Sequence, residues 1–264
     1  MTEFAPVSSS GHLILVPWLF DWSILSNASL NKTFDVALHV GTLIGALAYF
    51  RHEVVRYLAA WGRSLRRRSI ADVDERIAWA LVLGTIPGVI VGGLFADVIE
   101  EKLGQPWLIA VMLAAFGVVL WAVDRAMPRD RDFDSIGPRT GVALGVAQAV
   151  ALQPGVSRSG ITMTAARAIG IDREAAARFS FLLSLPIIAG AGLFKGIDVA
   201  QHGFQGYATQ FLWGVVASAV SGFVVIWWLL GYLRRHSLSA FMWYRLGAAA
   251  IVVIAIAAGR PATL

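Results

Sequence analysis

The sequence contains no cysteine among its 264 residues. Disulfide bonds, thiolate metal sites and cysteine nucleophiles are therefore excluded, because each of them needs the cysteine sulfur. We also expect no cleavable signal peptide, because residues 1–11 lack both a basic segment and an apolar core. Any reactive centre must use oxygen and nitrogen side chains.

Charged residues are scarce, at 15% of the chain against 57% hydrophobic residues, and the mean hydropathy is +0.67. Soluble domains usually carry about 25% charged residues. Several apolar runs are long enough to cross ~30 Å of hydrocarbon. The sequence therefore predicts an integral membrane protein, and a soluble α/β enzyme is the disfavoured alternative. The net charge of +5 lies mainly in loops, which indicates membrane orientation and argues against nucleic-acid binding.

Long apolar runs predict spanning helices, and two shorter runs at 13–20 and 140–152 cannot cross a bilayer. The expected spans are Phe34–Phe50, Ile77–Phe95, Trp107–Val123, Ala175–Phe194, Phe211–Leu233 and Phe241–Ala258. We expect the polar stretches between them to be loops, at 21–32, 51–74, 97–105, 124–139, 198–209 and 234–238.

Two polar, glycine-containing stretches interrupt the apolar sequence. Pro154–Thr162 contains a full charge at Arg158, and Pro6–Ile14 repeats its order of proline, serine, serine and glycine within one residue of slippage. A charge in apolar surroundings is a functional-site hypothesis by default. Two such breaks in corresponding halves of a chain indicate an internal repeat with a site between the halves.

Arginine-rich loops at 51–75, 124–139 and 234–238 are expected in the cytoplasm, and the loops at 97–106 and 198–209 outside. This orientation makes the second half of the chain run upside down relative to the first. The predicted fold is an all-α integral membrane protein, with one polytopic domain over 1–264. It consists of two inverted-topology repeats, 1–127 and 140–260, each a re-entrant helical hairpin plus three transmembrane helices.

Each polar stretch is suited to begin a half-helix, because proline is tolerated in the first turn and serine is a good N-cap. Open N–H groups and the positive end of the dipole would then form an anion site. Two such ends and the Arg158 guanidinium suit a diphosphate. Glu3 and His12 add a carboxylate and an imidazole near the same place, and this set can perform phosphoryl transfer with or without a metal.

Other polar residues are given more ordinary roles. His39 lies inside a predicted span and is expected to be a packing or hydrogen-bonded residue. Arg167, Arg173 and Arg178 follow the second break and are expected at the membrane interface. Two glutamines flank that break, Gln148 and Gln153, and either bind phosphate or satisfy freed backbone groups.

At these motifs the sequence resembles the undecaprenyl-diphosphate phosphatase family of the bacitracin-resistance type. The similarity covers nearly the whole chain in order. The strongest matches are Thr2–Ile14 and Pro154–Thr162, with weaker support from Phe34–Thr42 and Gly84–Pro87.

The resemblance implies a bacterial inner-membrane enzyme with an outward-facing site. Its substrate is a C55 polyprenyl diphosphate, which it hydrolyses to the monophosphate, and so recycles the lipid carrier of peptidoglycan synthesis. It also implies a divalent cation, Mg²⁺ or Ca²⁺, with Glu3 as a metal ligand. The implied catalytic residues are Glu3, Ser9, His12 and Arg158. The implied diphosphate-binding residues are Ser8, Ser10, Gly11, Gly155, Ser157, Ser159, Gly160 and Thr162. Whether Ser9 or water attacks, and whether the chain forms a homodimer, stays open.

One departure concerns the start of the chain. In the family pattern Glu3 is the second of two acids, and the position of the first, four residues earlier, falls before Met1. The leading half of the first re-entrant hairpin is missing as well. We therefore expect a truncated or late-started chain, in which the fold is retained and catalysis is in doubt.

Two other functions compete with hydrolysis. A lipid or anion transporter is favoured by architecture alone, because inverted repeats with broken helices are common in transporters. The clustered glutamate, serine, histidine and arginine favour an enzyme. A second membrane phosphatase superfamily also uses Ser-Gly-His and Ser-Arg patterns. It needs a further histidine downstream of its Ser-Arg, and residues 160–173 contain none.

Overall fold

The computed structural model describes residues 2–22, 28–202 and 207–263, and its regular elements are helices. They are α1 Ser9–Phe20, α2 Ala28–Tyr49, α3 Arg51–Arg67, α4 Val73–Leu103, α5 Pro106–Ala126, α6 Pro138–Ala149, α7 Arg158–Ala168, α8 Arg173–His202, α9 Ala208–Leu233 and α10 Ser239–Ala257, with short 3-10 turns at Phe133–Ser135 and Val150–Leu152. Within this part of the chain, five helices are long and apolar enough to cross a membrane, or six if α2 and α3 count as one bent span. The prediction of an all-α, multi-pass membrane protein is confirmed.

The expected loop at 51–74 is wrong, because most of it is helix α3. Its apolar residues Val54, Tyr57 and Trp61 recur at helical spacing and pack against the core, while most of its arginines are exposed. The helix turns away from α2 by 83°. A hydropathy pattern misses such a helix because its charged face hides its apolar face.

Several other predicted loops are also partly helical. Helix α4 continues through the acidic stretch to Leu103 and ends only at Gly104, just before Pro106 begins α5. Helix α8 likewise continues to His202, and α2 begins at Ala28. Glutamate and lysine are good helix formers, so polarity alone does not end a helix. Residues 23–27 and 203–206 of the remaining predicted loops lie outside the described residues.

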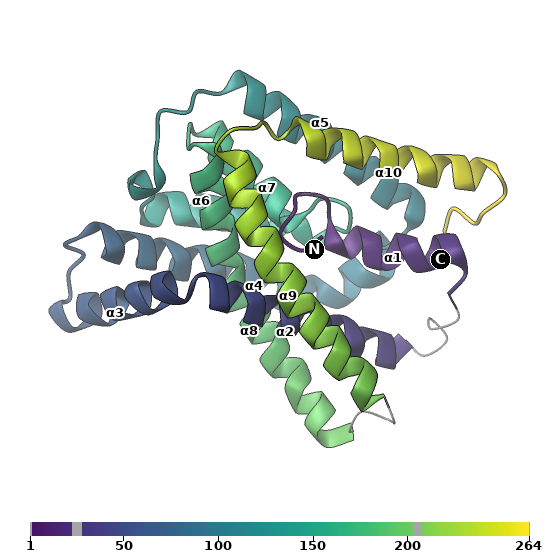
Figure 1. Ribbon diagram of the computed structural model, residues 1–264, viewed down its shortest axis with the longest axis horizontal. Helices are drawn as coiled ribbons and strands as arrows, with labels where there is room; N and C mark the ends of the chain where they lie inside the picture. The colour runs from purple at the N-terminus through teal and green to yellow at the C-terminus, as the bar shows by residue number, and fades with distance from the viewer. Residues whose placement is uncertain (1, 23–27, 203–206, 264) are drawn as a thin grey trace.

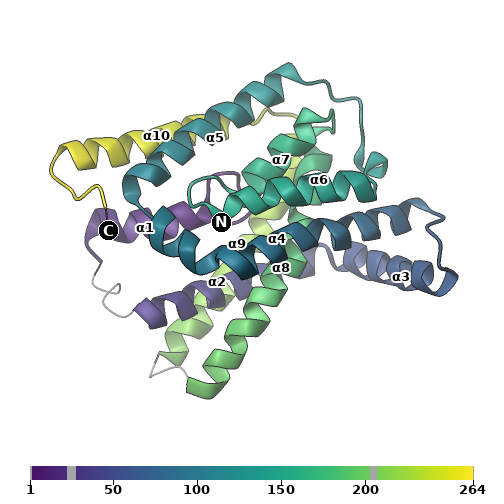
Figure 2. The same ribbon diagram turned by 180° about the vertical axis from the view of Figure 1, so that it is seen from behind.

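Close backbone contacts hold the long helices together. A Cβ atom on Gly145 of α6 would lie 2.0 Å from the carbonyl oxygen of Gly84 in α4, and one on Gly45 of α2 would lie 2.2 Å from that of Ala219 in α9. Only glycine permits these approaches, which are typical of helices packed in a membrane. In Figures 1 and 2, α4 crosses α6, and α5 runs beside α10.

Arg167 and Arg173, predicted to lie at the membrane interface, are enclosed by protein. Both are buried and bind the carboxylate of Asp124 at the end of α5, with Nε–Oδ1 distances of 3.1 Å for Arg167 and 2.7 Å for Arg173. The amide of Leu238 donates to the same carboxylate, at 3.2 Å. This cluster joins α5, α7, α8 and the start of α10.

The short helices α1 and α7 begin in the same way. Ser8 and Ser157 are their N-caps, and each hydroxyl accepts from the backbone amide three residues on, Gly11 or Gly160. Both serines have positive φ angles, 71° and 75°. This region is unfavourable for residues other than glycine and is found most often at functional sites. The capping hydrogen bonds of Ser8 and Ser157 confirm the predicted serine caps.

Candidate functional site

The loops before α1 and α7 meet in the middle of the molecule (Figures 1 and 2). The amide of Gly155 donates to the Ser8 hydroxyl at 3.0 Å, and the Ser159 hydroxyl donates to the carbonyl of Ala5 at 3.2 Å. Two segments more than half the chain apart are thus joined directly by hydrogen bonds. The prediction that the two polar stretches meet is confirmed.

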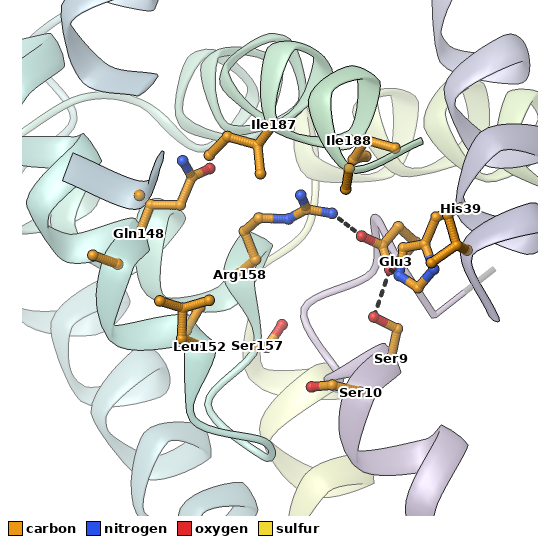
Figure 3. Close-up of a pocket in the computed structure, with 15 residues that line it drawn as sticks. Glu3, Ser9, Ser10, His39, Gln148, Leu152, Ser157, Arg158, Ile187 and Ile188 are labelled. Carbon is orange, nitrogen blue, oxygen red and sulfur yellow. Dashed lines mark hydrogen bonds and ion pairs between the residues drawn. The ribbon is translucent and has the colours of Figure 1, made fainter. Parts of the chain in front are cut away.

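A cavity of about 290 Å³ lies at this junction. Its polar lining includes Glu3, Ser9 and Ser10 on one side and Ser157 and Arg158 on the other, together with His39 and Gln148. Figure 3 shows the Arg158 side chain extending across the pocket toward Glu3. The predicted site residues that line this cavity are therefore Glu3, Ser9, Ser10, Ser157 and Arg158.

Glu3 contacts three side chains through its two carboxylate oxygens. Oε1 is paired with the Arg158 guanidinium, and Oε2 accepts the Ser9 hydroxyl at 2.5 Å and lies 3.2 Å from Nε2 of His39. The Glu3 side chain is only 7% exposed. A nearly buried carboxylate that accepts a hydrogen bond from a serine hydroxyl is placed as a general base beside a nucleophile would be.

His39, predicted to be a packing or hydrogen-bonded residue, is hydrogen-bonded and lies in the pocket lining beside Glu3. Its Nδ1 is 2.6 Å from the carbonyl oxygen of Asp35. A carbonyl only accepts, so Nδ1 carries a hydrogen. Nε2 faces the Glu3 carboxylate, so His39 links α2 to that carboxylate. Sequence reasoning missed this contact because it depends on how α2 packs beside the loop before α1.

His12 points elsewhere. Its Nδ1 donates to the carbonyl of Ser8 at 2.8 Å, and its Nε2 accepts from the Tyr244 hydroxyl of α10 at 2.7 Å. It is not part of the cavity lining, although Ser9 in the turn before it is. The assignment of His12 as an acid–base residue stays a prediction.

The remaining predicted diphosphate ligands are not in the cavity lining. Ser8 and Ser159 bind backbone groups of the opposite loop, and Gly11 and Gly160 donate to the capping serines. Two more are structural by position, because Gly155 has a φ of 95° and Thr162 is fully buried. In this structure Ser8, Gly11, Gly155, Ser159 and Gly160 shape the two loops and the starts of α1 and α7, whereas Thr162 is buried inside α7.

Arg245 of α10 fastens both loops to α5. Its fully buried guanidinium donates to the carbonyls of Gly155 at 2.8 Å, Leu113 at 3.0 Å and Val156 at 3.1 Å, with a longer contact of 3.4 Å to Pro6. Sequence reasoning missed it, although a single arginine inside an apolar run was a usable signal.

A divalent cation fits this site only together with an anionic ligand. Among the described residues no group of three or more histidine, cysteine, aspartate or glutamate side chains is placed to hold a metal. Mg²⁺ in phosphate-binding enzymes is usually held by one or two carboxylates, water and the phosphates themselves. Glu3 and the serine hydroxyls are the pocket oxygens that such a shared site would use.

Comparison with known proteins gives a consistent picture. The family model of bacitracin resistance protein BacA matches residues 1–251. An undecaprenyl-diphosphatase of Pelotomaculum thermopropionicum is 47% identical over 258 residues, covering 98% of this chain and 92% of that protein. Those of Desulforudis audaxviator and Geobacter sulfurreducens are 45% and 44% identical, over 98% and 96% of this chain and 95% and 93% of theirs. The chain therefore belongs to the bacitracin resistance protein BacA family.

Proposed function

We propose that this protein hydrolyses undecaprenyl diphosphate to undecaprenyl monophosphate and inorganic phosphate. Relatives similar over almost the whole chain are named undecaprenyl-diphosphatase. The observation that carries the proposal is the Glu3–Ser9–Arg158 group, assembled in one pocket from two distant stretches. Its product would be the carrier lipid used again in peptidoglycan synthesis.

The fold we propose for this function is a pair of inverted repeats in the bacterial inner membrane, with the site opening to the periplasmic face. Support comes from the equivalent starts of α1 and α7, both capped by a serine with positive φ. The arginine-rich helix α3 and the basic segment between α9 and α10 favour the cytoplasm for those ends. The lipid substrate would enter from the surrounding bilayer.

The diphosphate is bound where α1 and α7 begin. Arg158 holds the phosphate oxygens, and Ser10 and Ser157 donate hydroxyl hydrogen bonds from the pocket walls. The N-terminal ends of both helices favour a negative charge at the same place. When the phosphate binds the Arg158 guanidinium, the ion pair between Arg158 and Glu3 breaks.

Ser9 is the nucleophile in this proposal, because its hydroxyl already donates to Glu3. The Ser9 oxygen bonds to the terminal phosphorus, Glu3 takes the hydroxyl proton, and the bond to the bridging oxygen breaks. Undecaprenyl monophosphate leaves with that oxygen. Water then cleaves the phosphoserine, inorganic phosphate is released, and Ser9 regains its proton. His39 holds Glu3 in position through both steps.

The proposal includes a divalent cation, Mg²⁺ or Ca²⁺, held by Glu3 and the oxygens of the bound diphosphate. A cation there would neutralise part of the phosphate charge. His12 keeps its proposed acid–base role only if its ring leaves Tyr244 during turnover.

The test is phosphate release from a C55 polyprenyl diphosphate by the purified protein in detergent, with Mg²⁺ or Ca²⁺ and with a chelator. We expect release that needs the cation and stops in the chelator. A transporter of the same fold would release no phosphate under any of these conditions, and that result would overturn the proposal.

A further inference from the structure

Gln148 is a buried amide at the edge of the pocket. It lies in the last turns of α6, is 3% exposed and lines the pocket. Neither its Nε2 nor its Oε1 has a hydrogen-bond partner among the described residues. Buried polar groups are nearly always paired, because an unpaired one destabilises the fold. Its position therefore suggests that a ligand completes its bonding.

The packing of α6 explains why none of the described protein groups satisfies this amide. Gly141, Gly145 and Gln148 form one face of α6, and the two glycines contact the backbone of α4. One helical turn farther along α4, the residue that faces Gln148 is Gly88, which has no side chain. A Cβ atom on Gly88 would be 3.7 Å from Nε2 of Gln148. The Nε2 and Oε1 atoms of Gln148 are therefore available to a ligand in the pocket.

The two ends of the pocket differ in chemistry. Figure 3 shows Gln148 and Glu3 on opposite sides of Arg158. Glu3 has Ser9 and His39 as neighbours, whereas the lining near Gln148 consists of Leu152 and Ile187 (Figure 3). A ligand that spans the pocket would meet the charged groups at one end, and a single amide on an apolar wall at the other.

We propose that Gln148 binds the phosphate that carries the prenyl chain, by donating from Nε2 to one of its oxygens. This inference rests on the proposed function. The terminal phosphate then lies at Ser9 and Glu3, Arg158 lies between the two phosphates, and the chain leaves along the apolar wall. The leaving monophosphate gains negative charge as the bridging bond breaks, and the amide stabilises that charge.

The decisive variant is Gln148→Met, which has nearly the same length but no hydrogen-bonding group. Losing a hydrogen bond to a charged group should lower kcat/KM for the diphosphate about 10- to 100-fold. Gln148→Glu, with the same shape and a negative charge, should lower it further. The melting temperature of Gln148→Met should be unchanged or higher, because an unpaired buried amide is removed.

A matched control separates a structural amide from a ligand-binding one. The Gln153 amide donates to the carbonyls of Leu103 and Pro154, at 3.1 and 3.0 Å. Gln153→Met should therefore lower the melting temperature. A similar loss of melting temperature in Gln148→Met, or an unchanged kcat/KM, would overturn the proposal.

A binding measurement keeps this test independent of turnover. Inorganic pyrophosphate should raise the melting temperature of the natural protein more than inorganic phosphate does, and Gln148→Met should abolish that difference. If the natural protein releases no phosphate from the lipid, the proposed function fails, while the pyrophosphate comparison still decides the role of Gln148. An equal pyrophosphate effect in both proteins would contradict the inference.

Discussion

Glu3 joins the parts of the site at the scale of single residues. Its two oxygens meet a guanidinium, a hydroxyl and an imidazole that come from α7, α1 and α2. The negative charge of Glu3 has two tasks in the proposed reaction. It takes the Ser9 proton, and it holds Arg158 in place until the diphosphate arrives.

Glu3→Gln keeps the shape of this side chain and removes its basicity. Loss of a general base should lower kcat about 10²- to 10⁴-fold. The effect on KM has two opposing parts, because the variant removes a negative charge that competes with phosphate for Arg158 and also removes a proposed ligand of the cation. Steady-state phosphate release measures both constants, and a kcat within twofold of the natural protein would rule out Glu3 as the base.

Arg245→Met tests how the loops are held. Several buried carbonyls would lose their donor, so the free energy of unfolding should fall by at least about 2 kcal/mol. Arg234→Met is the control, because its exposed pair with Glu174 should contribute ~1 kcal/mol or less. Thermal unfolding in detergent compares the two variants, and equal losses would contradict the role given to Arg245.

The sequence was sufficient to predict that Glu3, Ser9 and Arg158 lie close together, because they belong to two distinctive polar motifs, and their catalytic roles stay predictions. It was not sufficient for His39, whose contact with Glu3 joins segments that no local pattern relates. Nor could it show that the His12 ring turns toward Tyr244, because a rotamer depends on the neighbouring helix.

Helix contacts at the scale of elements explain how the pocket is built. Helices α4 and α6 touch through their backbones at Gly84 and Gly145, and this contact brings the end of α6 to the pocket. The apolar runs predicted these helices well. The amphipathic helix α3 and the polar ends of α4 and α8 were missed, because hydropathy reports lipid exposure and not helix formation.

Gly145→Ala should separate α4 from α6. Its Cβ would lie 2.0 Å from the carbonyl oxygen of Gly84, and overpacking of this kind costs about 1–3 kcal/mol. Gly93→Ala on α4 is the matched control, because a Cβ there meets nothing within 4 Å. The control should be neutral or stabilising, and equal melting temperatures for the two variants would contradict the packing described.

The whole molecule has a charge asymmetry that predicts its orientation in the membrane. Its lack of cysteine makes the orientation testable with single substitutions. Exposed Ser69 lies between α3 and α4, and exposed Tyr207 lies just before α9. With a membrane-impermeant maleimide added to intact spheroplasts, Tyr207→Cys should react at once and Ser69→Cys only after permeabilisation. The reverse pattern would place the arginine-rich ends outside.

The central claim is that the two polar stretches form one catalytic site, and Arg158 tests it most directly. The measurement is phosphate release from a C55 polyprenyl diphosphate by Arg158→Ala beside the natural protein, with Mg²⁺ present. The account predicts that the natural protein releases phosphate and that the variant is slower by about 10³-fold, the loss expected when an arginine that stabilises phosphoryl transfer is removed. Turnover by Arg158→Ala at the natural rate would contradict it.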